Sequence, residues 1–172
     1  MDVRFPIGKP VIPEEMTKEA IDSFVKELEM FPAKLNEALE NLPEKSLEAT
    51  YREGGWTVRQ LVHHLADAHM NGFVRFKWAL TEESPAVKTF DINKWADTYE
   101  AQGSPIEGSL MLLSGLHAKW VYLLRSLTLE DFEKTFYHPD RDKTMTLFTW
   151  LCNYTWHGNH HLQHIKIALQ NT

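Results

Sequence analysis

Apolar residues recur at intervals of three and four in four long stretches of the chain, the spacing that places them on one face of an α-helix. The first stretch runs from Ile21 to Leu42 and is closed by Pro43. Pro32 lies inside it, where the missing backbone donor predicts a bend. The pattern therefore predicts an amphipathic helix at the start of the chain.

A capping box predicts where the second helix begins. Thr57 precedes the next apolar stripe and Gln60 follows it by three residues, so each side chain can bond the other's backbone N–H group. The stripe continues to Leu80, and Pro85 ends it.

Two more long helices follow in the second half of the chain. Ser104 and Pro105 resemble a cap followed by proline at the first helical position, which predicts a third helix running to Leu124. Thr128 is expected to cap a short helix, and residues 137–142 have turn composition with short strands on either side. The fourth long helix is predicted from about residue 146 to about residue 170.

Four amphipathic helices and no internal repeat indicate a single all-α domain over residues 1–172, with the architecture of a four-helix bundle. Sites in such bundles are built from inward side chains on facing helices. The segment from about residue 83 to 103 is a long excursion that we expect to cover one end of the bundle.

Composition narrows the functional classes. The net charge is −6, with 18 basic and 24 acidic residues, which argues against binding nucleic acid or an anionic membrane. A single cysteine, Cys152, excludes an internal disulfide or a Cys-based zinc site. The chain begins without the apolar stretch of a signal peptide and contains no run of 18 apolar residues, so we expect a cytoplasmic location.

Nine histidines are the most informative feature of the composition. His157 and His161 lie one helical turn apart, and His161 occupies a position where the stripe calls for an apolar side chain. Two imidazoles at this spacing can converge on one cation, although core histidines bonded to backbone or tyrosine groups would give the same pattern. His160 and His164 form a second pair on a flanking face, expected to be solvated or to support the first pair.

A third metal ligand would come from the second helix, which carries His63, His64 and His69. Counting about 100° per residue, His69 falls in the middle of the apolar stripe and His64 lies to one side, so the pattern favours His69 but leaves both open. His117 lies on the stripe of the third helix as a core or supporting residue, and His138 is expected to be exposed in its turn.

Three imidazoles without a fourth protein ligand would leave one coordination position open, as in catalytic zinc sites. Imidazole suits both Zn²⁺ and Ni²⁺, so the donor type does not select the ion. Such a cation would activate water or a substrate thiol at neutral pH.

Several longer motifs are similar to those of a known family: residues 51–60 (YREGGWTVRQ), residues 63–67 (HHLAD), residues 136–140 (FYHPD) and residues 156–161 (WHGNHH). The chain resembles the DinB superfamily, and within it the YfiT-like group of metal-dependent hydrolases. The resemblance implies a four-helix bundle that forms a homodimer and holds one divalent metal ion. Carried over position by position, it implies that His64, His157 and His161 are the ligands.

The same resemblance implies two reactions on a small-molecule substrate. The leading hypothesis is metal-dependent hydrolysis; the alternative is S-transfer of a low-molecular-weight thiol such as bacillithiol. A non-catalytic, metal-binding stress protein is the third hypothesis. No residue is assigned as a catalytic acid or base: Asp67 is expected at the helix surface or beside an imidazole, and Cys152 as a buried thiol.

Overall fold

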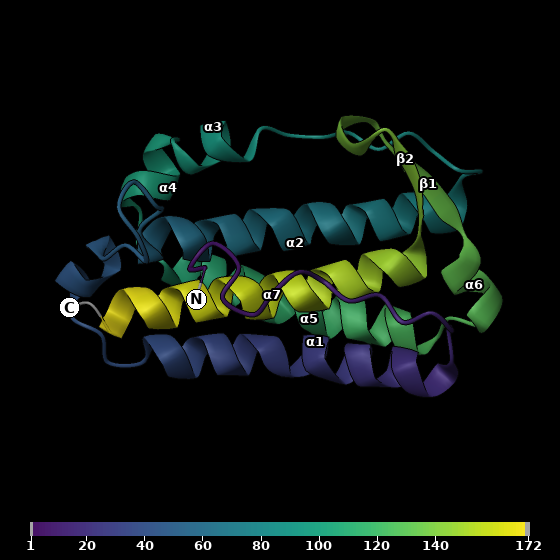
Figure 1. The fold of residues 1–172 in the computed structure, drawn as a ribbon, viewed down its shortest axis with the longest axis horizontal. Coiled ribbons are helices and arrows are strands. Elements are labelled where there is room, and N and C mark those ends of the chain that lie inside the picture. The colour runs from purple at the N-terminus through teal and green to yellow at the C-terminus, as the bar shows by residue number, and fades with distance from the viewer. Residues whose placement is uncertain (1, 171–172) are drawn as a thin grey trace.

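The computed structural model describes residues 2–170 and is dominated by four long helices. Figure 1 shows them packed side by side as a four-helix bundle, as the sequence predicts. They are α1 (Lys18–Leu39), α2 (Val58–Thr81), α5 (Glu107–Arg125) and α7 (Leu147–Gln170).

The helices are not arranged in chain order. Helix α1 packs against α5 and α7, and α2 packs against the same two helices, so α1 and α2 lie diagonally across the bundle. In Figure 1, α2 and α5 run in one direction and α1 and α7 in the other. Helix α7 is thus antiparallel to α2, and their facing side chains meet in reverse order.

Because α2 and α5 run in the same direction, the chain must return along the whole bundle between them. The return carries two short helices, α3 (Ile92–Ala96) and α4 (Tyr99–Gly103), and both contact α2. The expectation that this segment covers one end of the bundle is therefore wrong; it runs along the side of α2 (Figure 1).

Short elements join the long helices at the two ends. A 3₁₀ turn, Glu44–Glu48, lies between α1 and α2. Between α5 and α7 come α6 (Leu129–Glu133), β1 (Thr135–His138), a 3₁₀ turn (Pro139–Arg141) and β2 (Lys143–Thr146). The strands pair antiparallel in register Thr135 with Thr146, which confirms the predicted turn with flanking strands.

Local signals placed most helix ends correctly. Thr57 and Gln60 form the capping box at the start of α2, with bonds of 3.0 and 3.1 Å. The prediction that Ser104 caps the third long helix is wrong, because Ser104 ends α4 and α5 begins after Ile106. Pro32 lies inside α1, which runs through it as one helix, and the bend expected there stays a prediction.

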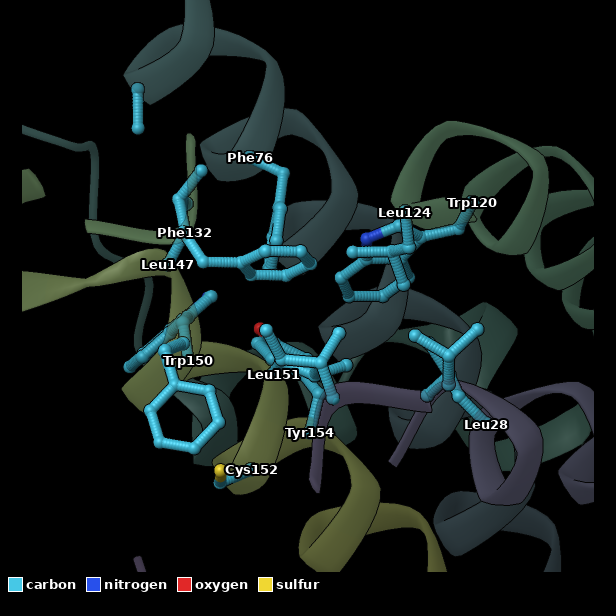
Figure 2. Close-up of a cluster of buried hydrophobic side chains, with 14 of the residues drawn as sticks. Leu28, Phe76, Trp120, Leu124, Phe132, Leu147, Trp150, Leu151, Cys152 and Tyr154 are labelled. Carbon is cyan, nitrogen blue, oxygen red and sulfur yellow. The ribbon is translucent and has the colours of Figure 1, made fainter. Parts of the chain in front are cut away.

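The apolar core is divided into two clusters along the bundle axis, and Figure 2 shows the one nearer the hairpin. On α1 the first cluster ends at Leu28 and the second begins at Phe31; on α5 the corresponding residues are Trp120 and Leu113. Histidines lie at or beside this break on α2, α5 and α7 and form a layer between the clusters: His64, His69, His117, His157, His160 and His161. His64 lies at the edge of the second cluster.

The N-terminal segment before α1 lies along α7. The indole N–H of Trp156 donates to the carbonyl of Gly8 at 3.1 Å, and Phe5 lies 6.0 Å from the ring of His160. This segment therefore covers the outer face of the histidine layer.

Candidate metal centre

The structure brings His64, His157 and His161 together from α2 and α7. One ring nitrogen of each lies within 4.8 Å of the others, and the Nε2 atoms of His64 and His157 are 3.1 Å apart. The rings lie 4.6–5.1 Å apart between centroids. Among residues 2–170, no carboxylate or thiol joins this group.

A close approach of α2 and α7 makes this meeting possible. Gly72 faces the ring of Tyr154, where an added Cβ would lie 2.4 Å from the ring carbon Cζ. The hydroxyl of Tyr154 donates to the carbonyl of Ala68 at 2.8 Å, which ties the two helices together one turn from the imidazoles. The missing side chain at Gly72 therefore sets the helix separation that the cluster needs.

A chain of buried histidines fixes the tautomer of His157. The carbonyl of Leu28 can only accept, so His117 donates to it from Nδ1 at 2.7 Å. The free Nε2 of neutral His117 then accepts from Nδ1 of His69 at 2.8 Å, and Nε2 of His69 accepts from Nδ1 of His157 at 3.3 Å. Nε2 of His157 is left with its lone pair toward the cluster.

A second, shorter series of hydrogen bonds fixes the tautomer of His161. Nε2 of His164 donates to the carbonyl of Val3 at 3.0 Å, so its Nδ1 accepts from Nδ1 of His161 at 3.3 Å. Nε2 of His161 therefore also carries a lone pair. Both chains end on backbone carbonyls, which cannot reverse their direction.

Burial keeps these imidazoles neutral at pH 7. Desolvation lowers the pKa of His64 to about 4 and holds the pKa values of His157 and His161 well below the usual range. Repulsion among the neighbouring imidazolium forms adds to the effect for His157 and His161. A neutral imidazole has the free lone pair that a metal ligand requires.

The other histidines have different positions from those expected. His69, favoured by the helical pattern, is fully buried but belongs to the chain behind His157 and not to the cluster. His160 and His164 are buried, so of the two alternatives the solvated one is wrong, and His164 supports His161 through a bond of 3.3 Å. Together with His161 they form a second group of close ring nitrogens. His138 is also buried, contrary to the expected exposed turn, because its ring packs 5.5 Å from that of Trp150.

Asp67 and Cys152 do not join the site. Asp67 is half-buried rather than exposed, and burial followed by repulsion from Glu100 raises its pKa to about 6. Within the part of the chain described, its carboxylate forms no hydrogen bond to an imidazole. Cys152 is a buried free thiol as expected, and burial raises its pKa to about 12, so it is a poor nucleophile.

The cluster opens into a cavity of about 520 Å³. Its walls include two residues that the sequence analysis missed, Arg75 of α2 and Arg141 of the hairpin. The sequence contains no signal for Arg75, because consecutive residues point about 100° apart on a helix and the neighbour of Phe76 falls outside the predicted apolar stripe. Only the structure shows that Arg75 is buried.

Comparisons with known proteins identify the family. The family model of the DinB superfamily matches residues 27–165. The chain is 45% identical over 165 residues to "Putative metal-dependent hydrolase YfiT" of Bacillus subtilis (strain 168), covering 96% of this chain and 93% of that protein. It is 47% identical over 164 residues to a protein of Bacillus cereus (strain AH820) also named as a putative metal-dependent hydrolase, covering 95% and 94%.

The chain therefore belongs to the DinB superfamily. The solved structure of B. subtilis YfiT, described as "a probable metal-dependent hydrolase with an unusual four-helix bundle topology", superposes with a TM-score of 0.96 at 43% identity, covering 99% of this chain and 98% of that one. A second solved four-helix bundle protein, TT2238, matches at 22% identity with a TM-score of 0.58, covering 88% and 99%, and shows the fold alone. Between residues 2 and 170, no helix is both long and apolar enough to cross a membrane.

Proposed function

We propose that the chain is a metal-dependent hydrolase in which His64, His157 and His161 hold one divalent cation, Zn²⁺ or Ni²⁺. The observation that carries the proposal is the convergence of three neutral imidazoles from two helices at the wall of an open cavity. The names of the related Bacillus proteins support the same class of reaction.

The donor geometry fits a cation. Bonds of about 2.0–2.1 Å at tetrahedral angles put two ligand nitrogens about 3.3 Å apart, and the two Nε2 atoms of His64 and His157 lie 3.1 Å apart. Hydrogen bonds behind His157 and His161 hold each ring with its lone pair inward, which is how outer partners orient ligating histidines.

The chain's own residues would bind and orient the reactants. When bound at three imidazoles, a divalent cation lowers the pKa of water toward neutrality and polarises a substrate oxygen. Trp56 packs 4.7 Å from the ring of His64 and 6.4 Å from that of His161, and it lines the same cavity as the three imidazoles. This cavity would admit the substrate.

Metal content tests the ligand set. His64→Ala, His157→Ala and His161→Ala should each lose the metal found in protein purified without added metal, as measured by elemental mass spectrometry. His160→Ala is the matched control, because His160 is buried on the same helix beside the cluster. It should keep most of the metal; equal loss in all four variants would refute the assignment.

Turnover separates the reactions. The metal-loaded protein should hydrolyse members of an ester and amide panel, and a chelator should abolish turnover while the protein stays folded. Conjugation of bacillithiol to a chlorobimane above the uncatalysed rate, without hydrolysis, would replace hydrolysis with S-transfer. Unfolding on chelation, with no turnover in either assay, would leave the metal a structural role.

A further inference from the structure

The cavity beside the three imidazoles has a second chemical feature, a cationic wall. Arg75 and Arg141 line the same cavity as His64, His157 and His161. A molecule in the cavity can therefore meet the imidazoles and the guanidinium groups together.

Arg75 is a buried cation without a counter-ion. Its residue is 5% exposed, and its guanidinium donates from Nη2 to the carbonyl of Lys88 at 3.0 Å. Its buried Nε has no hydrogen-bond partner, and across residues 2–170 no carboxylate oxygen lies within 4.0 Å of its nitrogens. Because arginine stays charged, a buried guanidinium left this way is costly unless an anion from outside completes it.

The guanidinium groups of Arg75 and Arg141 both pack against the ring of Trp150. The guanidinium carbon of Arg75 lies 5.5 Å from the ring centroid of Trp150, and that of Arg141 lies 5.3 Å from it. Contact with the ring face stabilises the charge without using N–H donors, and the buried Nε of Arg75 is left without a partner. His138 packs against the same indole, and its buried Nδ1 also lacks a partner.

The carboxylates in the cavity wall are occupied elsewhere. Asp140 accepts from the hydroxyl of Thr89 at 2.8 Å. Asp91 caps α3, accepting from the backbone N–H groups of Asn93 and Lys94 at 3.0 and 3.1 Å. Both carboxylates line the cavity, but neither forms an ion pair with the two guanidinium groups, so the N–H donors of the arginines have no direct carboxylate partner there.

We propose that Arg75 and Arg141 form a subsite for an oxyanion group, a carboxylate or phosphate, carried by an organic substrate. Guanidinium groups bind both anions through paired N–H donors. Phe90, Ile92 and Trp150 supply apolar walls for the rest of the molecule. The link between this anion and a reactive group at the imidazoles rests on the proposed function.

Calorimetric titration of the full chain in the presence of a chelator tests the subsite without any metal. The probes are benzoate and phenyl phosphate, with benzamide as the uncharged analogue and inorganic phosphate as the anion without an organic part. At least one of the two organic anions should bind at least about tenfold more tightly than benzamide, because charge-assisted hydrogen bonds are about twice as strong as neutral ones. It should also bind at least about tenfold more tightly than inorganic phosphate, which has no apolar part to contact the apolar walls.

Variants assign the effect to the two arginines. Arg75→Gln should weaken binding of the organic anion at least about tenfold, and Arg141→Gln should weaken it several-fold because that side chain is exposed. Arg125→Gln is the matched control, since Arg125 is a surface residue paired with Glu29 on another face. Should Arg75→Gln fail to fold, the exposed Arg141→Gln variant carries the test.

The subsite would be overturned if neither benzoate nor phenyl phosphate bound more tightly than benzamide, or if the changes at Arg141 and Arg125 had equal effects. Inorganic phosphate that binds as tightly as the tighter of the two organic anions would overturn the organic substrate and leave a plain anion site. Because no metal is present, a failure here leaves the proposed hydrolase standing. Conversely, loss of the metal assignment would leave measured anion binding intact.

Discussion

Gly72 gives the sharpest test of how the two halves of the histidine cluster are held together. Glycine in the middle of a helix costs about 1 kcal/mol relative to alanine, so Gly72→Ala would stabilise α2 if only the helix mattered. An added Cβ would instead lie 2.4–2.7 Å from three ring carbons of Tyr154. The ring cannot move aside easily, because Trp120, Trp150 and His69 pack around it.

The net effect follows from three contributions. The helix gains about 1 kcal/mol, overpacking costs about 1–3 kcal/mol, and displacement of the hydroxyl of Tyr154 from the carbonyl of Ala68 costs about 1 kcal/mol. We therefore expect Gly72→Ala to lower the free energy of unfolding by about 1–3 kcal/mol. The wider helix separation should also weaken metal binding.

Urea denaturation followed by circular dichroism measures the change, with the slope checked for constancy. Gly115→Ala is the control, because Gly115 is exposed in the middle of α5 with nothing within 4 Å of an added Cβ. That variant should gain about 0.5–1 kcal/mol. In a Tyr154→Ala background, Gly72→Ala should also become stabilising, since the ring is gone. A single Gly72→Ala variant as stable as Gly115→Ala would refute the close approach.

Three further predictions follow from the buried groups. His69→Phe keeps a ring against Phe31 but removes the hydrogen bond between His69 and His157. It should lower zinc affinity about 10–100-fold in a competition assay without abolishing binding. Unchanged affinity would show that this hydrogen bond does not support the ligand. Burial lowers the pKa of His117 from 6.5 to about 4, so the unfolded chain takes up a proton first as the pH falls. Below about pH 6.5, His117 should therefore lower the free energy of unfolding by about 1.4 kcal/mol for each pH unit. The free energy of unfolding should fall less steeply with pH in His117→Gln. Urea denaturation at pH 7, 6 and 5 measures this dependence, and the same dependence in both proteins would contradict the prediction. Cys152 should resist a disulfide reagent at pH 8 until the protein is unfolded, because burial raises its pKa to about 12; rapid labelling of the native protein would show the thiol to be accessible.

Much of the fold could be predicted because its signals are local. The helical period placed the four long helices, the capping box placed the start of α2, and turn residues placed the hairpin. Ser104 was predicted to begin a helix but ends one, because serine is found at both kinds of helix end. Only the structure, in which Ser104 follows the last residue of α4, distinguishes the two roles. Assembly into a homodimer and a cytoplasmic location stay predictions.

Local signals in the sequence predicted only part of the metal site. His157 and His161 come from one helix, so their spacing alone brings their rings within 4.6 Å. The choice between His64 and His69 depends on how α2 lies against α7, which periodicity cannot give because a bundle helix is buried on a wide arc. The resemblance to the family pointed to His64, and the structure brings His64 into the cluster with the other two.

By itself, then, the sequence determined the helices, the histidine pair on α7 and the family. Only the tertiary structure decided which helices face each other, how buried histidines fix the ring tautomers through the carbonyls of Leu28 and Val3, and that Arg75 lacks a counter-ion. The physical reason is the range of the interactions. Helix periodicity and caps act within a few residues, whereas hydrogen bonds and charge pairing depend on atoms that are distant in the chain and meet only when it packs.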